Sequence, residues 1–150
     1  MKNNYSIDER QILIRGNIYK HMFILMGVLF LLDALVKDFN FIWVEGIYSS
    51  ILIVIFSIMV GSIEMILKNV YFTEGSRQKY FVLLLGGISI VSCILTIIEM
   101  INQKGNIILN GKLSKDGAFL SISGSILIIA VIFVIQQFRN SKLEEQQDNE

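Results

Sequence analysis

One stretch of this chain, segment 118–138, limits what the chain can fold into more than any other feature. It reads AFLSISGSILIIAVIFVIQQF and contains 21 residues, none of them charged. Two similar stretches precede it, with 19 uncharged residues at 80–98 and 18 between Glu45 and Glu64. An α-helix rises about 1.5 Å per residue, so about 20 residues cross a hydrocarbon core roughly 30 Å thick. Each stretch therefore predicts a transmembrane helix.

A fourth span is predicted before these three, although its uncharged run is shorter. Only 12 residues separate Lys20 from Asp33. The span can still extend from about 18 to 36 if Lys20 and Lys37 reach the two membrane surfaces with their long side chains. The predicted fold is all-α: a polytopic membrane protein with a four-transmembrane-helix bundle and an N-terminal interfacial helix. The predicted parts are a single membrane domain, 1–138, with spans at 18–36, 44–67, 80–101 and 118–138, and a polar cytoplasmic tail, 139–150.

The composition argues against several other classes of protein. Hydrophobic residues make up 53% of the chain and charged residues 17%, against about 25% charged residues in soluble domains. The formal net charge is zero, which gives no basic field for a nucleic acid. The chain has one histidine, His21, and one cysteine, Cys93, and it lacks the HExxH, GxSxG and phosphate-loop motifs. We therefore expect no enzyme activity, no metal site, no cofactor and no nucleic-acid partner.

The distribution of lysine and arginine predicts the orientation in the cell membrane. Basic residues are usually more frequent in loops on the cytoplasmic side. Four basic residues lie on one side of the predicted spans: Lys37, Lys104, Lys112 and Lys115. Nine lie on the other side: Lys2, Arg10, Arg15, Lys20, Lys68, Arg77, Lys79, Arg139 and Lys142. This bias predicts that both termini are cytoplasmic.

Three segments outside the predicted spans carry local signals. Ser6 and Glu9 are spaced as in a helix capping box, which predicts an interfacial helix that runs into the first span. Asn110-Gly111 lies between two short apolar or mixed runs of residues and is typical of a tight β-hairpin turn. The tail is expected to extend the last helix only briefly.

The acidic residues near the spans are the candidates for chemistry. Asp33, Glu45 and Glu99 all fall near the outer surface in the predicted topology, whereas Glu64 falls near the inner surface. A charge in mid-bilayer costs at least about 3 kcal/mol, so such residues are often functional. The three outer acids could together form a cation or proton site.

A structural interpretation of these acids is strongly supported by their spacing. Asp33 precedes Lys37 by four residues, and Glu64 precedes Lys68 by four, which is the favourable order for an ion pair within one helix. Glu45 follows Trp43 at a predicted membrane boundary. Glu99 differs from the other acids in being followed at the same spacing by an uncharged residue, Gln103. Glu99 is therefore the acid for which a structural interpretation explains least.

Small residues recur at helical spacing within the last three spans. Such residues let membrane helices approach each other closely. We therefore predict helix packing, within one chain or between chains, through a set of eight: Ser57, Gly61, Gly86, Ser89, Cys93, Gly117, Ser121 and Ser125.

Four features together carry a resemblance to a known group of proteins. They are the N-terminal DERQ, the short first span, the Trp after that span and IEMILKNVYF at 63–72. With these features the chain resembles small four-span integral membrane proteins of Gram-positive bacteria, a group defined by a domain of unknown function. The resemblance implies a cell-membrane protein and, as for members of such groups, a role beside a transcriptional regulator. Small multidrug exporters also have four spans, but they carry a glutamate midway in the first span, where this chain has Gly27.

Two functions are consistent with these observations. The first is a non-enzymatic membrane protein that acts through helix packing, as a homo-oligomer or as the partner of another membrane protein. The second is a small transporter or ion-conducting protein in which Asp33, Glu45 and Glu99 line an outer acidic site. Only the second requires these three carboxylates to converge.

Overall fold

The computed structural model describes residues 9–44, 46–70, 78–103 and 105–147. Within them lie four helices, each long and apolar enough to cross a membrane. The helices are α1 (Glu9–Asp38), α2 (Tyr48–Leu67), α3 (Gln78–Gln103) and α4 (Lys115–Gln147). A short β-hairpin of β1 (Ile108–Leu109) and β2 (Lys112–Leu113) connects α3 to α4. The prediction of an all-α protein with four potential spans is confirmed.

Two of the helices extend beyond their predicted spans. The N-terminal segment from Glu9 is continuous with the first span in α1, whereas Ser6, the predicted cap, lies outside the described residues. α4 continues to Gln147, well beyond the brief extension that the sequence predicted. The segment 139–147 is rich in Arg, Lys, Glu and Gln, which are good helix formers, and it contains neither glycine nor proline. Nothing in that segment ends the helix.

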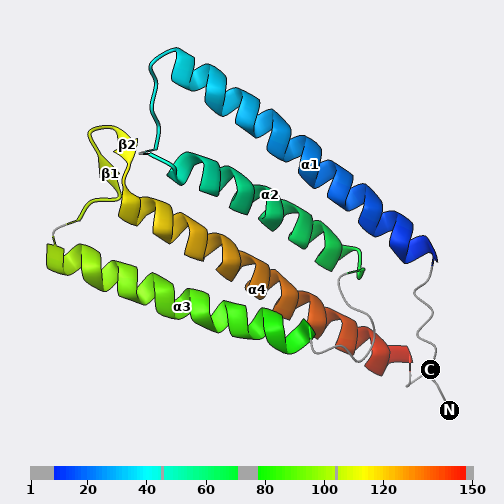
Figure 1. The fold of residues 1–150 in the computed structure, drawn as a ribbon. Coiled ribbons are helices and arrows are strands. Elements are labelled where there is room, and N and C mark those ends of the chain that lie inside the picture. The colour runs from blue at the N-terminus through cyan, green and yellow to red at the C-terminus, as the bar shows by residue number, and fades with distance from the viewer. Residues whose placement is uncertain (1–8, 45, 71–77, 104, 148–150) are drawn as a thin grey trace.

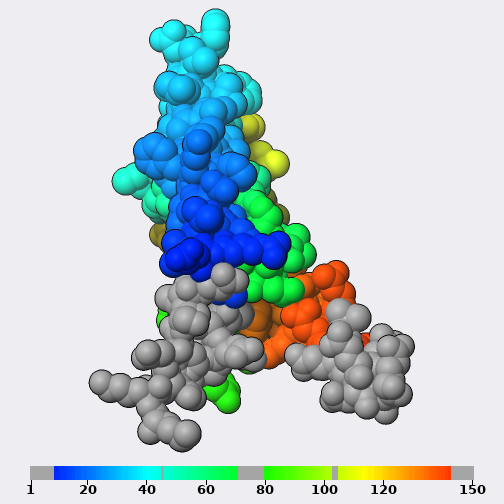
Figure 2. All heavy atoms as spheres, turned by 90° about the vertical axis from the view of Figure 1, so that its right-hand side faces the viewer, coloured from blue at the N-terminus to red at the C-terminus, as the bar shows by residue number. Residues whose placement is uncertain are grey.

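The helices form one open layer in the order α1, α2, α4, α3 (Figure 1). The view turned by 90° is much narrower, as expected for a single layer (Figure 2). Each helix runs antiparallel to the one that precedes it in the chain. We call the end that holds the hairpin and the α1–α2 connection the hairpin end, and the opposite end the terminal end. α1 and α3 are the edges of the layer.

Two small clusters of buried residues hold the layer together near the terminal end. Ile18 of α1 packs on Met65 of α2 and on Val70 just after α2. Ile66, Val82 and Phe133 join α2, α3 and α4 in the second cluster. Most of the remaining apolar side chains lie on the outer surface of the layer. Such a surface is suited to lipid, since hydrocarbon chains are as apolar as the side chains themselves.

Asparagine ends both α1 and α2. Asn40 has φ 59° and Asn69 has φ 54°, a left-handed conformation that asparagine tolerates better than most residues. In α1 the Asn40 N–H donates to Lys37 O and the Phe41 N–H to Val36 O. This pair of bonds is the Schellman motif, and the same pattern follows Met65 and Ile66 at the end of α2. Both helix ends are therefore encoded locally.

The predicted hairpin is confirmed. Asn110 and Gly111 both have positive φ, 51° and 77°, as a two-residue type I′ turn requires. Its strand residue Leu113 also donates its N–H to Trp43 O over 2.8 Å and forms a parallel bridge with Val44. The hairpin therefore ties the α3–α4 connection to the α1–α2 connection and fixes the backbone at Trp43.

Candidate functional site

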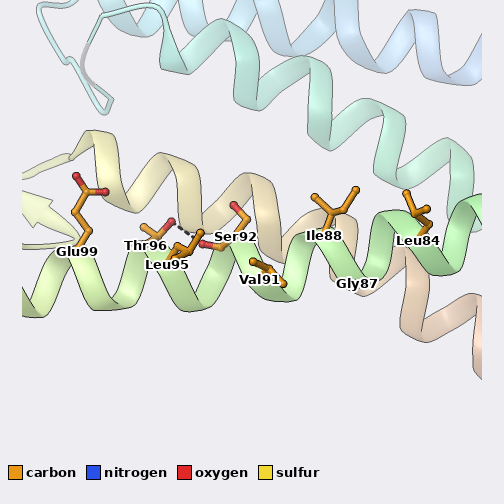
Figure 3. Close-up of a pocket in the computed structure, with 8 residues that line it drawn as sticks. All are labelled: Leu84, Gly87, Ile88, Val91, Ser92, Leu95, Thr96 and Glu99. Atoms are coloured by element: carbon orange, nitrogen blue, oxygen red, sulfur yellow. Dashed lines mark hydrogen bonds between the residues drawn. The ribbon is translucent and has the colours of Figure 1, made fainter.

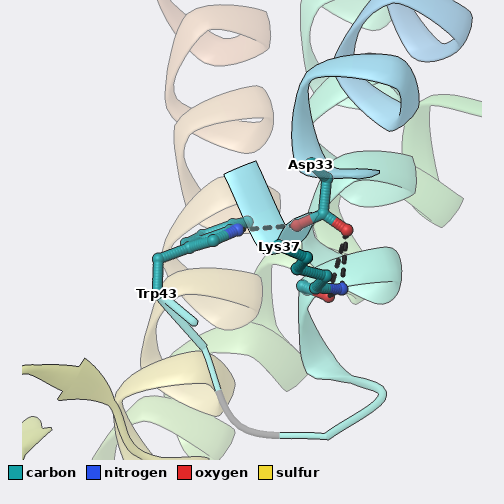
Figure 4. A network of polar contacts seen from close by, with 4 residues as sticks. Asp33, Lys37 and Trp43 are labelled. Atoms are coloured by element: carbon teal, nitrogen blue, oxygen red, sulfur yellow. Dashed lines mark hydrogen bonds and ion pairs between the residues drawn. The ribbon is translucent and has the colours of Figure 1, made fainter. Parts of the chain in front are cut away.

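The most buried charged group among the described residues is Asp33, which lies in the last two turns of α1 with only 8% of its surface exposed. Its Oδ2 accepts a hydrogen bond from Lys37 Nζ over 2.7 Å, and its Oδ1 accepts one from Trp43 Nε1 over 2.7 Å (Figure 4). Lys37 Nζ also donates to Ser49 Oγ over 2.7 Å. Ser49 Oγ lies 3.5 Å from Asp33 Oδ2. We call these four residues the Asp33 network.

Three separate elements supply the Asp33 network. Asp33 and Lys37 are one turn apart on α1, so both side chains lie on the same face of the helix. Ser49 belongs to the first turn of α2 and is fully buried against α1. Trp43 comes from the connection between the two helices, where β2 holds its backbone. The network therefore joins α1, α2 and their connection at the hairpin end.

The geometry of the network is that of a satisfied carboxylate. Both oxygens of Asp33 accept short hydrogen bonds, and the Lys37 ammonium compensates its charge. Hydrogen bonds to an ionised group are about twice as strong as neutral ones. Removing one member of a buried ion pair is costly because the other charge is left uncompensated. The arrangement therefore suits Asp33 to fastening two helices together.

The described part of one chain does not bring the predicted outer acids together. Asp33 is on α1 and Glu99 is on α3, the two edges of the layer, with α2 and α4 between them (Figure 1). Glu45 lies outside the described residues. Packed helices are about 8–10 Å apart, so three such spacings separate the helices that carry Asp33 and Glu99 by roughly 25 Å.

Glu99 lies at one end of a shallow groove along α3, with a volume of about 570 Å³. Ser92 and Thr96 continue the groove toward the middle of the helix, and apolar residues line the rest (Figure 3). Glu99 itself is exposed and takes part in a polar or electrostatic interaction of its own. Glu99 lies one turn before the end of α3 at Gln103.

Glu64 belongs to a separate cluster at the terminal end. Lys68 Nζ contacts Glu64 Oε1 over 2.6 Å, and His21 Nδ1 lies 3.6 Å from Glu64 Oε2. The pairing of Glu64 with Lys68 has the predicted spacing of four residues. His21 adds a link from α1 to α2 that the sequence did not indicate.

The small residues of α2 and α3 occupy contacts of different kinds. Gly61 of α2 packs directly on Met22 of α1. A Cβ at Gly86 would lie 2.8 Å from the Cβ of Ala130, so this glycine lets α3 approach α4 closely. Ser57 and Ser89 are buried, and each donates its hydroxyl to a carbonyl of its own helix.

The remaining small residues lie away from tight helix contacts. Cys93 is a half-buried free thiol on α3. Gly117 packs on the hairpin, where an added Cβ would lie 2.5 Å from Ile107 O. Ser121 and Ser125 line a recess between α1, α2 and α4. Among the eight predicted packing residues, Gly61 and Gly86 contact a neighbouring helix, whereas Gly117 contacts the hairpin. Ser121 and Ser125 line the recess.

Several polar contacts lie outside the set that the sequence suggested. Ser92 and Ser123 join α3 to α4 through hydroxyls 3.0 Å apart. Asn69 Oδ1 accepts from Gln136 Nε2 over 3.2 Å and from Asn140 Nδ2 over 3.0 Å. Ser92 was detectable as a small polar residue in a span, but its partner on α4 was not. The bonds from α4 to Asn69, just after α2, could not be predicted either, because they depend on the order of the helices.

Comparisons with known proteins add no relative to this description. No family model, no curated protein and no solved structure matches the chain. Among the described residues, no three histidine, cysteine, aspartate or glutamate side chains are placed to hold one metal ion. The site therefore has to be interpreted from its own geometry.

Proposed function

We propose that this chain is a non-enzymatic, multi-pass protein of the cell membrane that acts as a packing subunit, associating with further copies of itself or with another membrane protein. The observation that carries this proposal is the open layer of helices. α1 packs chiefly on α2, and α3 chiefly on α4. In a closed bundle each helix would have two neighbours, so the layer leaves two edges that can accept further helices.

The side chains on these edges support the same proposal. Phe23 on α1 is 78% exposed and Leu95 on α3 is 60% exposed. Gly27 and Gly87, near the middle of the same two helices, have open space where a Cβ would lie. Membrane helices associate mainly through close van der Waals packing, for which small residues at the contact are favourable. Both edges therefore combine bulky apolar side chains with a glycine that permits close approach.

The orientation of the proposed subunit follows from its charges. The terminal end carries the N-terminal start of α1 and the C-terminal end of α4. The basic residues of the sequence are more frequent in the segments at this end, which favours a cytoplasmic location for both termini. A reporter fused to the C-terminus tests this orientation. The resemblance to four-span proteins of Gram-positive bacteria is consistent with this proposal and stays a prediction.

Disulfide crosslinking in native membranes tests association through the edges. In a Cys93→Ser background, we would introduce single cysteines by Phe23→Cys on α1 and Val91→Cys on α3. Ile58→Cys is the matched control, because Ile58 is also partly exposed but belongs to α2, which lies between α1 and α4 in the layer. We expect oxidation to crosslink one or both edge variants to a second chain, and the control to stay monomeric.

Affinity purification from native membranes separates a homo-oligomer from a complex with another protein. A crosslinked species of twice the mass of the chain indicates a second copy. A second protein that purifies with the chain in stoichiometric amount indicates a partner. If the chain purifies alone, as a monomer, and neither edge crosslinks, the packing proposal is wrong.

The transporter alternative requires carboxylates from more than one chain to meet, because Asp33 and Glu99 are on opposite edges of the layer. Proton and cation flux into liposomes that contain the purified chain decides it. If the wild type supports flux and Glu99→Gln abolishes it, the packing proposal is wrong and the chain is a transporter. Equal flux in the presence and absence of the protein would exclude the transporter.

A further inference from the structure

A recess of about 560 Å³ lies on one face of the layer, between α1, α2 and α4. Its floor is formed by Leu52 and Phe56 of α2, and one wall by Leu32 of α1. Ser121 and Ser125 of α4 form the opposite wall. Its volume falls within the range of about 300–1,000 Å³ that is typical of ligand sites, and its lining is largely apolar, as such sites are.

Aromatic and apolar residues flank the recess at the hairpin end. Phe41, Trp43 and Leu113 line it there, and Trp43 is held in place by its indole bond to Asp33 and by the backbone bond from Leu113. Trp43 therefore forms a fixed side of the recess at the level where α1 ends and the membrane surface is expected.

The depth of the recess matches half of a bilayer. On α4 its lining ends at Ser125, ten residues after the helix begins at Lys115. Ten residues of helix cover roughly 15 Å, and the hydrocarbon core is about 30 Å thick. The far end of the recess therefore lies near the middle of the bilayer, and the recess lies within the leaflet at the hairpin end.

The charges around the recess favour an uncharged chain inside it and an anion above it. Asp33 is the only ionisable residue of the lining, and Lys37 compensates its charge. The Ser121 and Ser125 hydroxyls donate to carbonyls of their own helix, so they present no unused donor. Lys37 is 37% exposed. An ammonium has three N–H groups, and Asp33 and Ser49 use two of them, which leaves one for a phosphate at the membrane surface.

We propose that the recess binds a phospholipid of the leaflet at the hairpin end, with one acyl chain between α1 and α4 and the phosphate near Lys37. This inference rests on the proposed membrane embedding of the chain. The bound lipid fills the gap that the open layer leaves beside α2. It also contacts Trp43, the only tryptophan of the protein.

The single tryptophan makes the proposal directly measurable, because bromine atoms on an acyl chain quench tryptophan fluorescence at short range. The full chain is reconstituted in dioleoylphosphatidylcholine vesicles that contain an increasing fraction of dibrominated phosphatidylglycerol or of dibrominated phosphatidylcholine. Brominated phosphatidylcholine exchanges with the host lipid at equal affinity, so its quenching of Trp43 should be half-maximal at a fraction of about one half. The anionic lipid, bound about threefold more tightly through one partly exposed charge contact, should be half-maximal at a fraction of about one quarter.

Filling the recess supplies the decisive comparison. Ser125→Phe places a ring between the walls and should abolish the quenching by lipid in the recess, and the smaller Ser121→Leu should weaken it. Ser141→Phe is the matched control, because Ser141 is an exposed serine of the same helix outside the recess. Helical content by circular dichroism identifies any variant that does not fold, in which case Ser121→Leu provides the comparison.

The outcomes separate this inference from the proposed function. Quenching that rises linearly, and equally in the wild type and both recess variants, means that Trp43 meets only bulk lipid, and the lipid site is then wrong. Equal half-saturation for the two headgroups overturns the preference of the Lys37 position for a net-anionic lipid. No quenching in purely brominated vesicles contradicts the membrane embedding itself.

Discussion

Replacing Asp33 by asparagine tests whether the Asp33 network holds α1 to α2. The asparagine keeps an oxygen for the Trp43 indole but has no negative charge for Lys37. Lys37 then retains only Ser49 among the partners that it has in the wild type. The substitution removes one charge-assisted hydrogen bond and changes the side-chain volume very little.

The expected loss of stability is about 1–2 kcal/mol. A hydrogen bond to a charged group contributes about 1.5–3 kcal/mol, and breaking a fully buried ion pair costs about 3–5 kcal/mol. The lower range applies because Lys37 is 37% exposed and can turn its ammonium to water. Measured polar contacts between membrane helices are also weak, about 0.6 kcal/mol on average and about 1.7 kcal/mol at most.

Unfolding in mixed micelles of a mild detergent and dodecyl sulfate measures this loss, with Trp43 emission and circular dichroism as probes. A double-mutant cycle with Lys37→Met isolates the ion pair, and we expect a coupling free energy of about 1 kcal/mol. If Asp33→Asn unfolds at the same detergent fraction as the wild type and the coupling is zero, the network does not fasten the helices.

Three further predictions concern the helix contacts and turns. Gly61→Leu should destabilise the fold by about 1–3 kcal/mol because the new side chain must displace Met22, whereas Gly27→Leu, at an open position, should be neutral or stabilising in the same unfolding assay. Asn69→Ala should cost about 1–2 kcal/mol through its positive φ, and Asn69→Gly should recover part of that loss. Gly111→Val should strain the hairpin turn. The bond from Leu113 to Trp43 O should then weaken, and Trp43 emission should shift to longer wavelength.

Much of the local structure could be predicted from the sequence because its causes are local. Uncharged runs of sufficient length predicted three of the four helices, the first needed its terminal lysines to reach the membrane surfaces, and Asn110-Gly111 predicted the hairpin. The spacing of Asp33 and Lys37 gave their ion pair. Each of these features depends on residues within a few positions of one another. The helical tail to Gln147 was underestimated because a polar composition was given more weight than its helix propensity.

The candidate site could be predicted only in part, because it depends on which helices are neighbours. Trp43 was recognised as an interfacial aromatic, but its bond to Asp33 depends on the chain reversal at Asn40. Ser49 carries no sequence signal beyond being a serine at the start of a helix. The separation of Asp33 from Glu99 follows from the placement of α2 and α4 between them, which no local pattern encodes.

The helix order itself has a physical explanation at the hairpin end. The backbone bond from Leu113 to Trp43 O joins the two connections at the hairpin end, and Ser114, immediately after Leu113, caps the first turn of α4 through a bond from the Gly117 N–H to its Oγ. The start of α4 is therefore held beside the end of α1 and the start of α2, and α3 is left on the outside of α4. The same bond fixes the backbone of Trp43, whose indole N–H donates to Asp33 in the Asp33 network. The turn at Asn110-Gly111 positions the strand that makes this bond, so loosening the turn should weaken both the proposed association through α3 and the proposed lipid binding.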